Sequence, residues 1–248
     1  MKKICFEELM ARYQVEAFYT PKEMGTWTYG NDDAPKLFAE LAQDLGITTE
    51  RIVRTIQTHT SAVKLVDAAN GGEGAVREFG ISGFDGMVTK EKNLLLCTLE
   101  ADCVPVFLID TKLGVIANVH SGWRGTVGQI SANALKLMAE KFGSEPENIV
   151  AGIGPCICEK CYEVSDDLLA PFKEVYAQNE VEQLFQPKAN GKYLLNLKKA
   201  IKLTLLKAGV AEDNIYDCGR CTYHEGVFDS YRLNGGKTWR MLSGIMLK

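Results

Sequence analysis

Apolar side chains recur every three to four positions in four segments of the chain, a spacing that predicts amphipathic helices. Two of the boundaries carry clear signals. Asn196 is a preferred N-cap residue, and Gly209 is typical of the position just past a helix end. We therefore expect helices at residues 35–45, 129–142, 165–178 and 196–208.

Short runs of β-branched and aromatic residues between these helices predict strands. They lie at 51–58, 62–66, 94–99, 104–110, 115–120, 148–153, 226–231 and 238–247. Three of them, at 94–99, 104–110 and 115–120, follow one another without a helix, which favours α+β layers over strict βαβ alternation. Residues 69–86 are rich in glycine and predict a loop, and no long linker or repeat divides the chain. We expect one domain over residues 1–248.

Composition adds few constraints to this pattern. Hydrophobic residues make up 46% and charged residues 24% of the 248 positions, as in ordinary globular proteins. The net charge of -4 gives no general attraction to nucleic acid or to anionic membranes. The N-terminal residues 1–14 contain no apolar core of a signal peptide, and no run is long enough to span a bilayer. We expect a cytoplasmic protein, in which the eight cysteines are not paired as disulfides.

Three short segments place reactive side chains at the ends of predicted strands. Residues 57–60 contain His59, residues 100–105 contain Cys103, and residues 120–125 contain His120. Loops held by a rigid scaffold commonly carry active sites. Taken singly, each of these residues is as well explained by packing: a histidine at a strand end is commonly a surface or core residue, and cysteine is among the most buried residue types.

Together, the three side chains make a plausible zinc site. Two imidazoles and one thiolate are good zinc ligands, and a set of three leaves a fourth position open, as in catalytic sites. Asp102 and Arg124 stand next to or near these ligands and could tune the site or hold an anion. The alternative for both is a surface ion pair. The glycines of residues 120–125 also precede a predicted helix, so backbone N–H groups there could approach a phosphate, although an ordinary strand–helix turn explains them equally well.

The other cysteines include two C-x-x-C pairs, Cys158 with Cys161 and Cys218 with Cys221. Such pairs form zinc ribbons when their spacing is suitable, but two predicted helices lie between these two. We expect these cysteines to be free thiols or core residues, with no second metal. The H-x-E motif of zinc deaminases, a Walker loop and a G-x-G-x-x-G turn are all absent from the sequence.

The motifs resemble those of the bacterial laccase-domain proteins, also called multicopper polyphenol oxidoreductases and now understood as purine nucleoside phosphorylases with adenosine deaminase activity. The family pattern corresponds here to Q-T-H-T at 57–60, A-D-C-V-P-V at 101–106, H-S-G-W-R-G at 120–125, G-P-C-I at 154–157, C-Y-E-V at 161–164, C-T at 221–222, S-Y-R at 230–232 and R-M at 240–241. Order and spacing fit from about residue 50 to the C-terminus. The family's glycine-rich G-G-V-S segment and its L-N-L are not recognisable before residue 50, the region 24–33 looks shortened, and Ser121 and Thr60 replace the usual alanine and glycine.

The resemblance implies that His59, Cys103 and His120 bind a catalytic zinc. It also implies a layered α/β sandwich of the α+β class with mixed sheets, similar to cysteine hydrolases and deamidases of the toxin type. The implied reactions are phosphorolysis of adenosine, inosine and related nucleosides, and deamination of adenosine. Purine nucleoside and phosphate would be the only partners, with no nucleic acid or membrane, and the protein would be a monomer or homodimer.

Two other chemistries stay open at this point. A copper-dependent phenol oxidase with several copper centres needs about ten histidines, given the preference of copper for imidazole, and this chain has three. A single copper in the same three ligands is chemically feasible. Metal-free nucleophilic catalysis by Cys103 with His120 as base would use the same residues. Asp102 and Arg124 complete the set of catalytic candidates.

Overall fold

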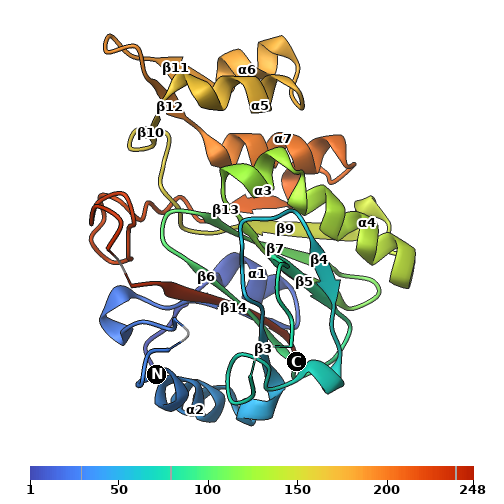
Figure 1. The fold of residues 1–248 in the computed structure, drawn as a ribbon. Coiled ribbons are helices and arrows are strands. Elements are labelled where there is room, and N and C mark those ends of the chain that lie inside the picture. Colours follow the sequence, from blue (N-terminus) through green and yellow to red (C-terminus); the bar gives the residue numbers. More distant parts are fainter. Residues whose placement is uncertain (29, 79, 238) are drawn as a thin grey trace.

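Two β-sheets packed face to face form the centre of the molecule, as the computed structural model of residues 1–28, 30–78, 80–237 and 239–248 shows (Figure 1). Helices cover the outer faces of both sheets. The α-helices of the described residues are α1 (Glu7–Arg12), α2 (Ala34–Leu45), α3 (Trp123–Val127), α4 (Ile130–Phe142), α5 (Leu169–Lys173), α6 (Gln178–Leu184) and α7 (Leu197–Lys207). None of these helices combines the length and apolar character needed to cross a bilayer.

The larger sheet has six strands over the described residues, in the order β13-β9-β7-β8-β5-β4. Their bounds are β4 (Val63–Leu65), β5 (Gly86–Thr89), β7 (Val104–Asp110), β8 (Val115–Ser121), β9 (Ile149–Ile153) and β13 (Ile215–Asp217). The sheet is mixed: β7 is antiparallel to both β8 and β9, whereas β13 runs parallel to β9 and β4 runs parallel to β5.

The smaller sheet has the order β1-β2-β14-β6-β3 over the described residues. Its strands are β1 (Ile4–Cys5), β2 (Val15–Tyr19), β3 (Ile52–Arg54), β6 (Leu95–Glu100) and β14 (Met241–Leu247). The last strand of the chain, β14, therefore lies between β2 and β6 and pairs antiparallel with both. This pairing brings the C-terminal segment back against the N-terminal part of the molecule.

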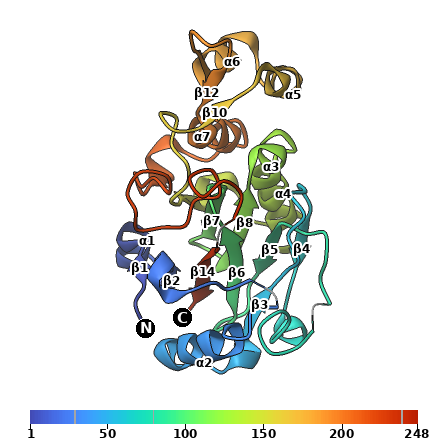
Figure 2. The ribbon, with the colours of Figure 1, turned by 60° about the vertical axis from the view of Figure 1, so that its left-hand side comes forward.

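A third, small sheet stands beyond α7, at the top of Figures 1 and 2, together with α5 and α6. It consists of β10 (Glu163–Val164), β12 (Tyr193–Leu195) and β11 (Phe185–Pro187), paired antiparallel in that order. Phe172 and Phe185 of this part pack edge to face, with ring centroids 5.1 Å apart, and belong to the same apolar core as α4 and α7.

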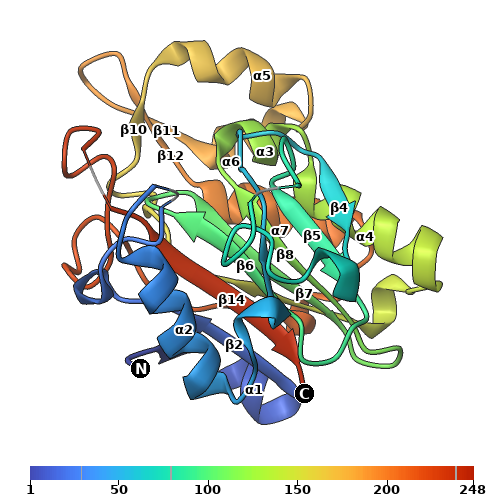
Figure 3. The ribbon, with the colours of Figure 1, turned by 60° about the horizontal axis from the view of Figure 1, so that its bottom comes forward.

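Three layers of apolar side chains separate the structural layers. One core lies between the six-stranded sheet and the helices α4 and α7, a second lies between the two large sheets, and a third lies between the five-stranded sheet and α2. In the third core, Phe38 and Leu41 of α2 are buried against Phe18 and Leu95, and Figure 3 shows α2 on that face of the sheet. The fold is a mixed α+β sandwich: the strand pattern predicts the α+β class, and the family resemblance implies the layered arrangement.

The pattern of apolar positions predicts most of the regular elements correctly. The helices expected at 35–45, 129–142 and 196–208 correspond to α2, α4 and α7, with Asn196 accepting a hydrogen bond from the Lys199 amide as N-cap. Gly209 has the positive φ of 92° expected just past a helix end. Six of the expected strands correspond to β3, β4, β6, β7, β8 and β9, and β14 covers 241–247 of the expected 238–247, residue 238 lying outside the described residues.

Three expectations need correction. The helix expected over 165–178 ends at Lys173, and α6 begins at Gln178 after an extended Ala177 with ψ of 156°. The strand expected over 51–58 is shorter, because only Ile52–Arg54 pairs regularly with β6. The segment 226–231 is not a strand: Gly226 has a φ of 71°, and turns and bends replace extended pairing there.

Two connections between the large sheets position the reactive residues. After β3 the chain leaves the smaller sheet and enters the larger one at β4, and His59 lies on this connection. After β6 it makes the same passage to β7, and Cys103 lies on that connection. His120 is near the end of β8, opposite Pro105 of β7. The sheet-to-sheet passages thus place residues far apart in sequence at one edge of the sandwich.

Candidate metal centre

His59, Cys103 and His120 converge in the structure. One ligand atom from each residue lies within 4.8 Å of the ligand atoms of the other two. The two imidazole rings have centroids 5.1 Å apart and meet edge to face. His120 is buried, Cys103 is partly buried and His59 is exposed, so the group opens to solvent on the His59 side.

Asp85, which directly precedes β5, fixes the loop that carries His59. Its carboxylate accepts hydrogen bonds from the backbone amides of Thr58, His59 and Thr60, at 2.9, 3.0 and 2.8 Å. His59 itself has a φ of 61°, in the left-handed region that a residue with a side chain seldom occupies. Such a conformation costs about 1–3 kcal/mol and persists where the surroundings enforce it. The three amide bonds to Asp85 provide that enforcement.

The same carboxylate orients the second imidazole. Asp85 Oδ2 lies 2.7 Å from Nδ1 of His120, and both side chains are buried. A carboxylate on one ring nitrogen of a histidine fixes the ring and directs the other nitrogen toward a metal or a reaction partner. The hydrogen bond and the charge of His120 hold the pKa of Asp85 below its usual value despite its burial. Asp85 is therefore ionised and serves both histidines.

Gly122 makes room for the three candidate ligands. A Cβ atom at this position would lie 2.8 Å from Sγ of Cys103 and 3.3 Å from Cδ2 of His59. The first distance is shorter than real contacts of a Cβ atom. The glycine after Ser121 is therefore a steric requirement of the site, because any side chain there would push Cys103 away from His59.

The Cys103 thiol ionises easily in this environment. Burial opposes its ionisation, but the charges and hydrogen bonds of His120 and His59 outweigh that effect and lower its pKa to about 6. Burial also opposes protonation of His120, while the Cys103 thiolate and the bond to Asp85 raise the His120 pKa to about 10. Without a metal, the pair is thus a thiolate and an imidazolium at neutral pH. A thiolate is the form that binds metals or acts as a nucleophile.

Glu100 brings a second buried carboxyl close to this pair. Burial raises its pKa to about 7, although the charge of His120 and a hydrogen bond from Ser243 work in the opposite direction. Its Oε1 is buried and has no hydrogen-bond partner among the described residues. Glu100 is the last residue of β6, and its carboxyl group can change its charge near neutral pH.

Two cavities adjoin the centre. The larger, of about 390 Å³, is lined by Cys103 and His59, by the aromatic rings of Trp123 and Tyr162, and by three arginines, Arg124, Arg232 and Arg240. The smaller, of about 230 Å³, is lined by His59 and His120 together with Arg54, Gln57 and Arg240. His59 and Arg240 line both, so the two cavities meet at the candidate ligands.

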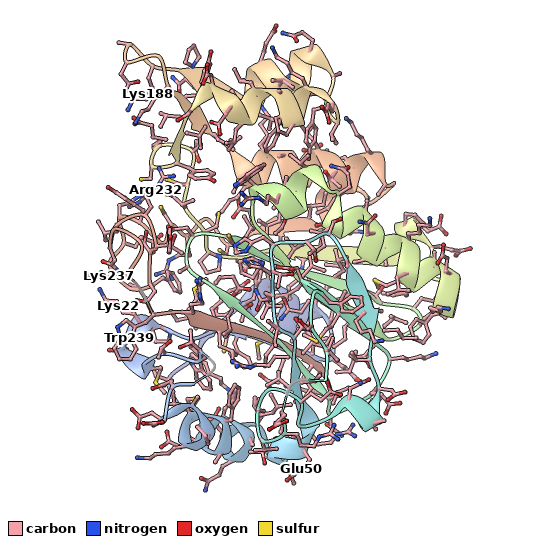
Figure 4. All side chains as sticks on the ribbon, viewed as in Figure 1. Lys22, Glu50, Lys188, Arg232, Lys237 and Trp239 are labelled. Atoms are coloured by element: carbon pink, nitrogen blue, oxygen red, sulfur yellow. The ribbon has the colours of Figure 1, made fainter. Side chains whose placement is uncertain are left out.

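The positive side chains reach the larger cavity from different parts of the chain. Arg124 is exposed and lies over the ring of Trp123, 4.3 Å from its centroid. Arg232 comes from the loop before β14, and Figure 4 shows it on the same side of the molecule as Trp239 of that loop. An arginine-rich cavity of this kind suits an anionic group such as phosphate.

Asp102 lines the larger cavity, but its carboxylate is engaged with the protein. Oδ1 accepts a hydrogen bond of 2.6 Å from the Thr222 hydroxyl, and Oδ2 accepts one of 2.7 Å from the Arg232 amide. Asp102 has a φ of 87°, which turns the chain sharply before Cys103. These contacts give Asp102 a positioning role, because it connects the Cys103 turn to the loop that carries Arg232.

The segment 120–125 leads into a short helix that the sequence pattern does not predict. α3 begins at Trp123 and has five residues, and α4 begins separately at Ile130 after Gln129 with a φ of 58°. With only five residues, α3 offers a small helix dipole to an anion. Arg124 and the arginines across the cavity are therefore better candidates for holding an anion than this helix start.

Sequence reasoning missed Asp85 and Glu100. Asp85 lies at the end of the glycine-rich segment 69–86, where Asp followed by Gly indicates an ordinary turn. Glu100 stands at the end of an apolar strand, a position where an acidic residue commonly points to solvent. Only the packing of β6 against β8 and β14 shows that Glu100 is buried. An acidic residue directly bordering an apolar strand was the available signal in both cases.

The chain is similar to known proteins in sequence and to a solved structure in fold. The chain is 37% identical to a protein of Bacillus subtilis (strain 168) named purine nucleoside phosphorylase YlmD, over 77% of this chain and 69% of that one. It is 34% identical to adenosine deaminase RL5 of an unknown prokaryotic organism, over 85% and 83%. The crystal structure of YlmD from Geobacillus stearothermophilus superposes with a TM-score of 0.89 at 30% identity, over 95% of this chain and 92% of that one. The family model described as multi-copper polyphenol oxidoreductase laccase matches residues 30–248, and the chain belongs to this family.

Proposed function

We propose that this protein is a metal-dependent purine nucleoside phosphorylase that acts on adenosine, inosine and related nucleosides and also deaminates adenosine. The observation that carries the proposal is the convergence of His59, Cys103 and His120 beside a cavity lined by three arginines. The names of two relatives, a purine nucleoside phosphorylase and an adenosine deaminase, support the two reactions.

The donor set fits zinc. Two imidazoles and a thiolate of lowered pKa are ligands that zinc prefers, and the exposed side at His59 leaves a position for a reactant. Asp85 on Nδ1 of His120 is the outer partner that metal-binding histidines commonly have. A zinc ion held there would act as a Lewis acid that polarises an oxygen of phosphate, sugar or water. Copper could occupy the same ligands as a single ion.

The cavity supplies the other requirements of phosphorolysis. Arg124, Arg232 and Arg240 would hold phosphate by charge-assisted hydrogen bonds. The rings of Trp123 and Tyr162 offer flat apolar faces for a purine base. With phosphate on the arginines and the base on the rings, the sugar carbon would face the anion. The phosphate oxygen then bonds to that carbon as the bond to the base nitrogen breaks, which gives free base and ribose 1-phosphate.

A second candidate is metal-free hydrolysis with Cys103 as nucleophile. Cys103, His120 and Asp85 form a thiolate–imidazole–carboxylate series, and the low thiol pKa favours it. A multicopper phenol oxidase is the third candidate, and the three histidines of the chain argue against several copper centres.

The products and the response to chelation separate these candidates. Purified protein is given adenosine with phosphate, and the products are separated by chromatography. We expect adenine and ribose 1-phosphate, and some inosine without phosphate. Activity should disappear after treatment with a strong chelator and return with zinc. Activity that survives chelation and is abolished by a thiol alkylator would identify the hydrolase instead, and oxygen uptake with a phenol only in the presence of copper would identify the oxidase.

The matched variant for this experiment is Cys103→Ala. It removes one candidate ligand and the thiol in a partly buried position. We expect a folded protein without activity on adenosine. An active, metal-replete Cys103→Ala protein would exclude both the metal centre and the cysteine nucleophile.

A further inference from the structure

Four residues outside the candidate metal centre form a second group of metal-binding side chains. One ligand atom from each of Cys158, Cys161, Cys221 and His224 lies within 4.8 Å of the ligand atoms of the other three. We propose that these residues hold a zinc ion in a closed structural site, separate from the centre at His59, Cys103 and His120. This proposal goes beyond the nucleoside chemistry and does not depend on it.

The distances within the group match the edges of a metal-centred tetrahedron. Sγ of Cys158 and Sγ of Cys161 lie 3.6 Å apart, and Nδ1 of His224 lies 3.4 Å from Cys161 Sγ and 3.9 Å from Cys158 Sγ. Tetrahedral zinc with bonds of about 2.3 Å to sulfur and 2.0 Å to nitrogen places its ligands about 3.5–3.8 Å apart. The observed separations are close to these edges.

The backbone around the group is arranged as in a compact metal-binding turn. The amides of Cys161 and Tyr162 both donate to the Cys158 carbonyl, at 2.9 and 3.0 Å, which closes a tight turn between the first two thiols. The amide of Cys158 points at Sγ of Cys221 at 3.4 Å. An N–H group directed at a sulfur atom stabilises a thiolate, which is the form that binds zinc.

The sheet topology explains why the sequence obscures this group. β13 runs parallel to β9, and the ladder extends past both strands through a bridge between Cys156 and Cys221. The turn with Cys158 and Cys161 follows β9, and the turn with Cys221 and His224 follows β13. The two ligand pairs are therefore C-x-x-C and C-x-x-H, and Cys218 lies outside the group. The proposal replaces the sequence-based expectation that these cysteines bind no second metal.

The chemistry of the group favours a structural zinc over a catalytic ion or a disulfide. Three thiolates and one imidazole fill all four positions of a tetrahedral zinc, so no position stays open for a reactant. None of the eight cysteines is in a disulfide, and a bond between Cys158 and Cys161 would leave Cys221 and His224 without a reason to converge.

The site would stabilise one wall of the larger cavity beside Cys103. Asp102, next to Cys103, accepts a hydrogen bond from the Ile157 amide at its carbonyl and one from the Thr222 hydroxyl at its carboxylate. Ile157 precedes Cys158, and Thr222 follows Cys221. A zinc ion joining these two turns would therefore hold them against Asp102, beside the larger cavity that Ile157 and Tyr162 line.

Metal analysis of the full chain tests this site separately from the first one. The protein is produced with zinc in the medium, purified without chelators and analysed by inductively coupled plasma mass spectrometry. We expect two zinc ions per chain in the wild type and one in Cys103→Ser. In the Cys103→Ser background, Cys161→Ser should lower the content to zero. The control Cys218→Ser, which changes a cysteine outside the group, should leave it at one.

A spectroscopic measurement keeps the test decisive if the Cys161→Ser protein does not fold. Cobalt replaces zinc in the Cys103→Ser protein, and the spectrum should show tetrahedral d–d bands with strong thiolate charge-transfer absorption. Absence of bound metal in Cys103→Ser, or a spectrum without thiolate charge transfer, would overturn the proposal. So would zinc content unchanged by Cys161→Ser, or a Cys158–Cys161 disulfide in protein purified without reductant, detected by mass spectrometry.

Discussion

Oδ2 of Asp85 lies 2.7 Å from Nδ1 of His120. The same carboxylate accepts the backbone amides on both sides of His59 and that of His59 itself. One buried side chain from the start of β5 therefore sets the ring of one candidate ligand and the backbone of the other. The two histidines depend on a residue that is not itself a ligand.

Asp85→Asn should weaken metal binding without removing a ligand. An amide has one acceptor oxygen and directs its NH₂ group toward backbone N–H donors, so it cannot hold both the His59 loop and His120. Loss of such an outer partner typically costs 10–100-fold in metal affinity or activity, and we expect a loss of that order. Competition with a chelating dye measures it. Asp110→Asn is the matched control, because Asp110 is also buried but binds the amides of Lys112 and Leu113 at the opposite end of β7. Equal affinities in wild type and Asp85→Asn would contradict this role.

Gly122→Ala should separate Cys103 from His59. The new methyl group would begin 2.8 Å from Cys103 Sγ, so the thiol must move. We expect a folded protein that loses most of its metal at this centre and its activity. In Gly125→Ala, within the helix that follows Gly122, the new methyl group meets its nearest atom at 3.3 Å, and this variant should lose far less of both. Metal content and circular dichroism are the measurements, and full metal content in Gly122→Ala would show that the steric argument is wrong.

The sequence predicts some residues of the candidate sites and misses others. His59, Cys103 and His120 are identifiable because ligand-type residues stand at the ends of recognisable strands, and α2, α4 and α7 are identifiable from apolar spacing and caps. Asp85 lies in a segment that the sequence marks only as a glycine-rich loop. Its role could not be predicted, because its partners come from the β3–β4 connection and from β8, which are distant in sequence. The group of Cys158, Cys161, Cys221 and His224 could not be predicted for a similar reason. Cys221 and His224 follow β13, and only the parallel pairing of β13 with β9 brings them close to the two other cysteines.

The interrupted helix after Ser165 shows a limit of periodicity. The apolar spacing continues through 165–178, but Tyr176 is buried with its hydroxyl bonded to Thr204 of α7. Ala177 is extended directly after it, and α6 then starts with Glu180 bonded to the Ala177 amide. A tertiary contact and a local cap therefore end one helix and begin another where the apolar pattern is continuous.

Arg124→Ala should affect phosphorolysis more than deamination. Arg124 lines the cavity beside Cys103, and a charge-assisted hydrogen bond to phosphate is worth about 1.5–3 kcal/mol. Because Arg124 is exposed, its loss should have an effect at the low end of this range and raise the KM for phosphate by about tenfold. Inosine formation without phosphate should change little. Arg12→Ala is the control, since Arg12 bonds to the Tyr216 hydroxyl and lines neither of the two cavities. Equal losses in both reactions would assign Arg124 to the nucleoside instead.

The contribution of Glu100 to the stability of the metal-free protein should fall as pH rises between about 4.5 and 7. Burial raises the pKa of Glu100 from 4.5 to about 7, so in this window the unfolded chain loses a proton that the folded protein retains. The shift corresponds to a loss of at most about 3 kcal/mol. Glu100→Gln should remove this loss and be more stable than wild type at pH 8, as measured by urea unfolding. Glu140→Gln, on the exposed face of α4, should leave the pH dependence unchanged, and a Glu100→Gln curve parallel to wild type would refute the assignment.

The position of a bound metal tests the account most directly. Crystals of protein purified without added metal are measured at wavelengths on both sides of the zinc absorption edge. We expect an anomalous peak with His59, Cys103 and His120 each contributing one atom at about 2.0–2.3 Å. The absence of a peak there in crystals of active protein, or a Cys103 Sγ more than about 6 Å from both imidazoles, beyond the reach of one ion, would contradict it.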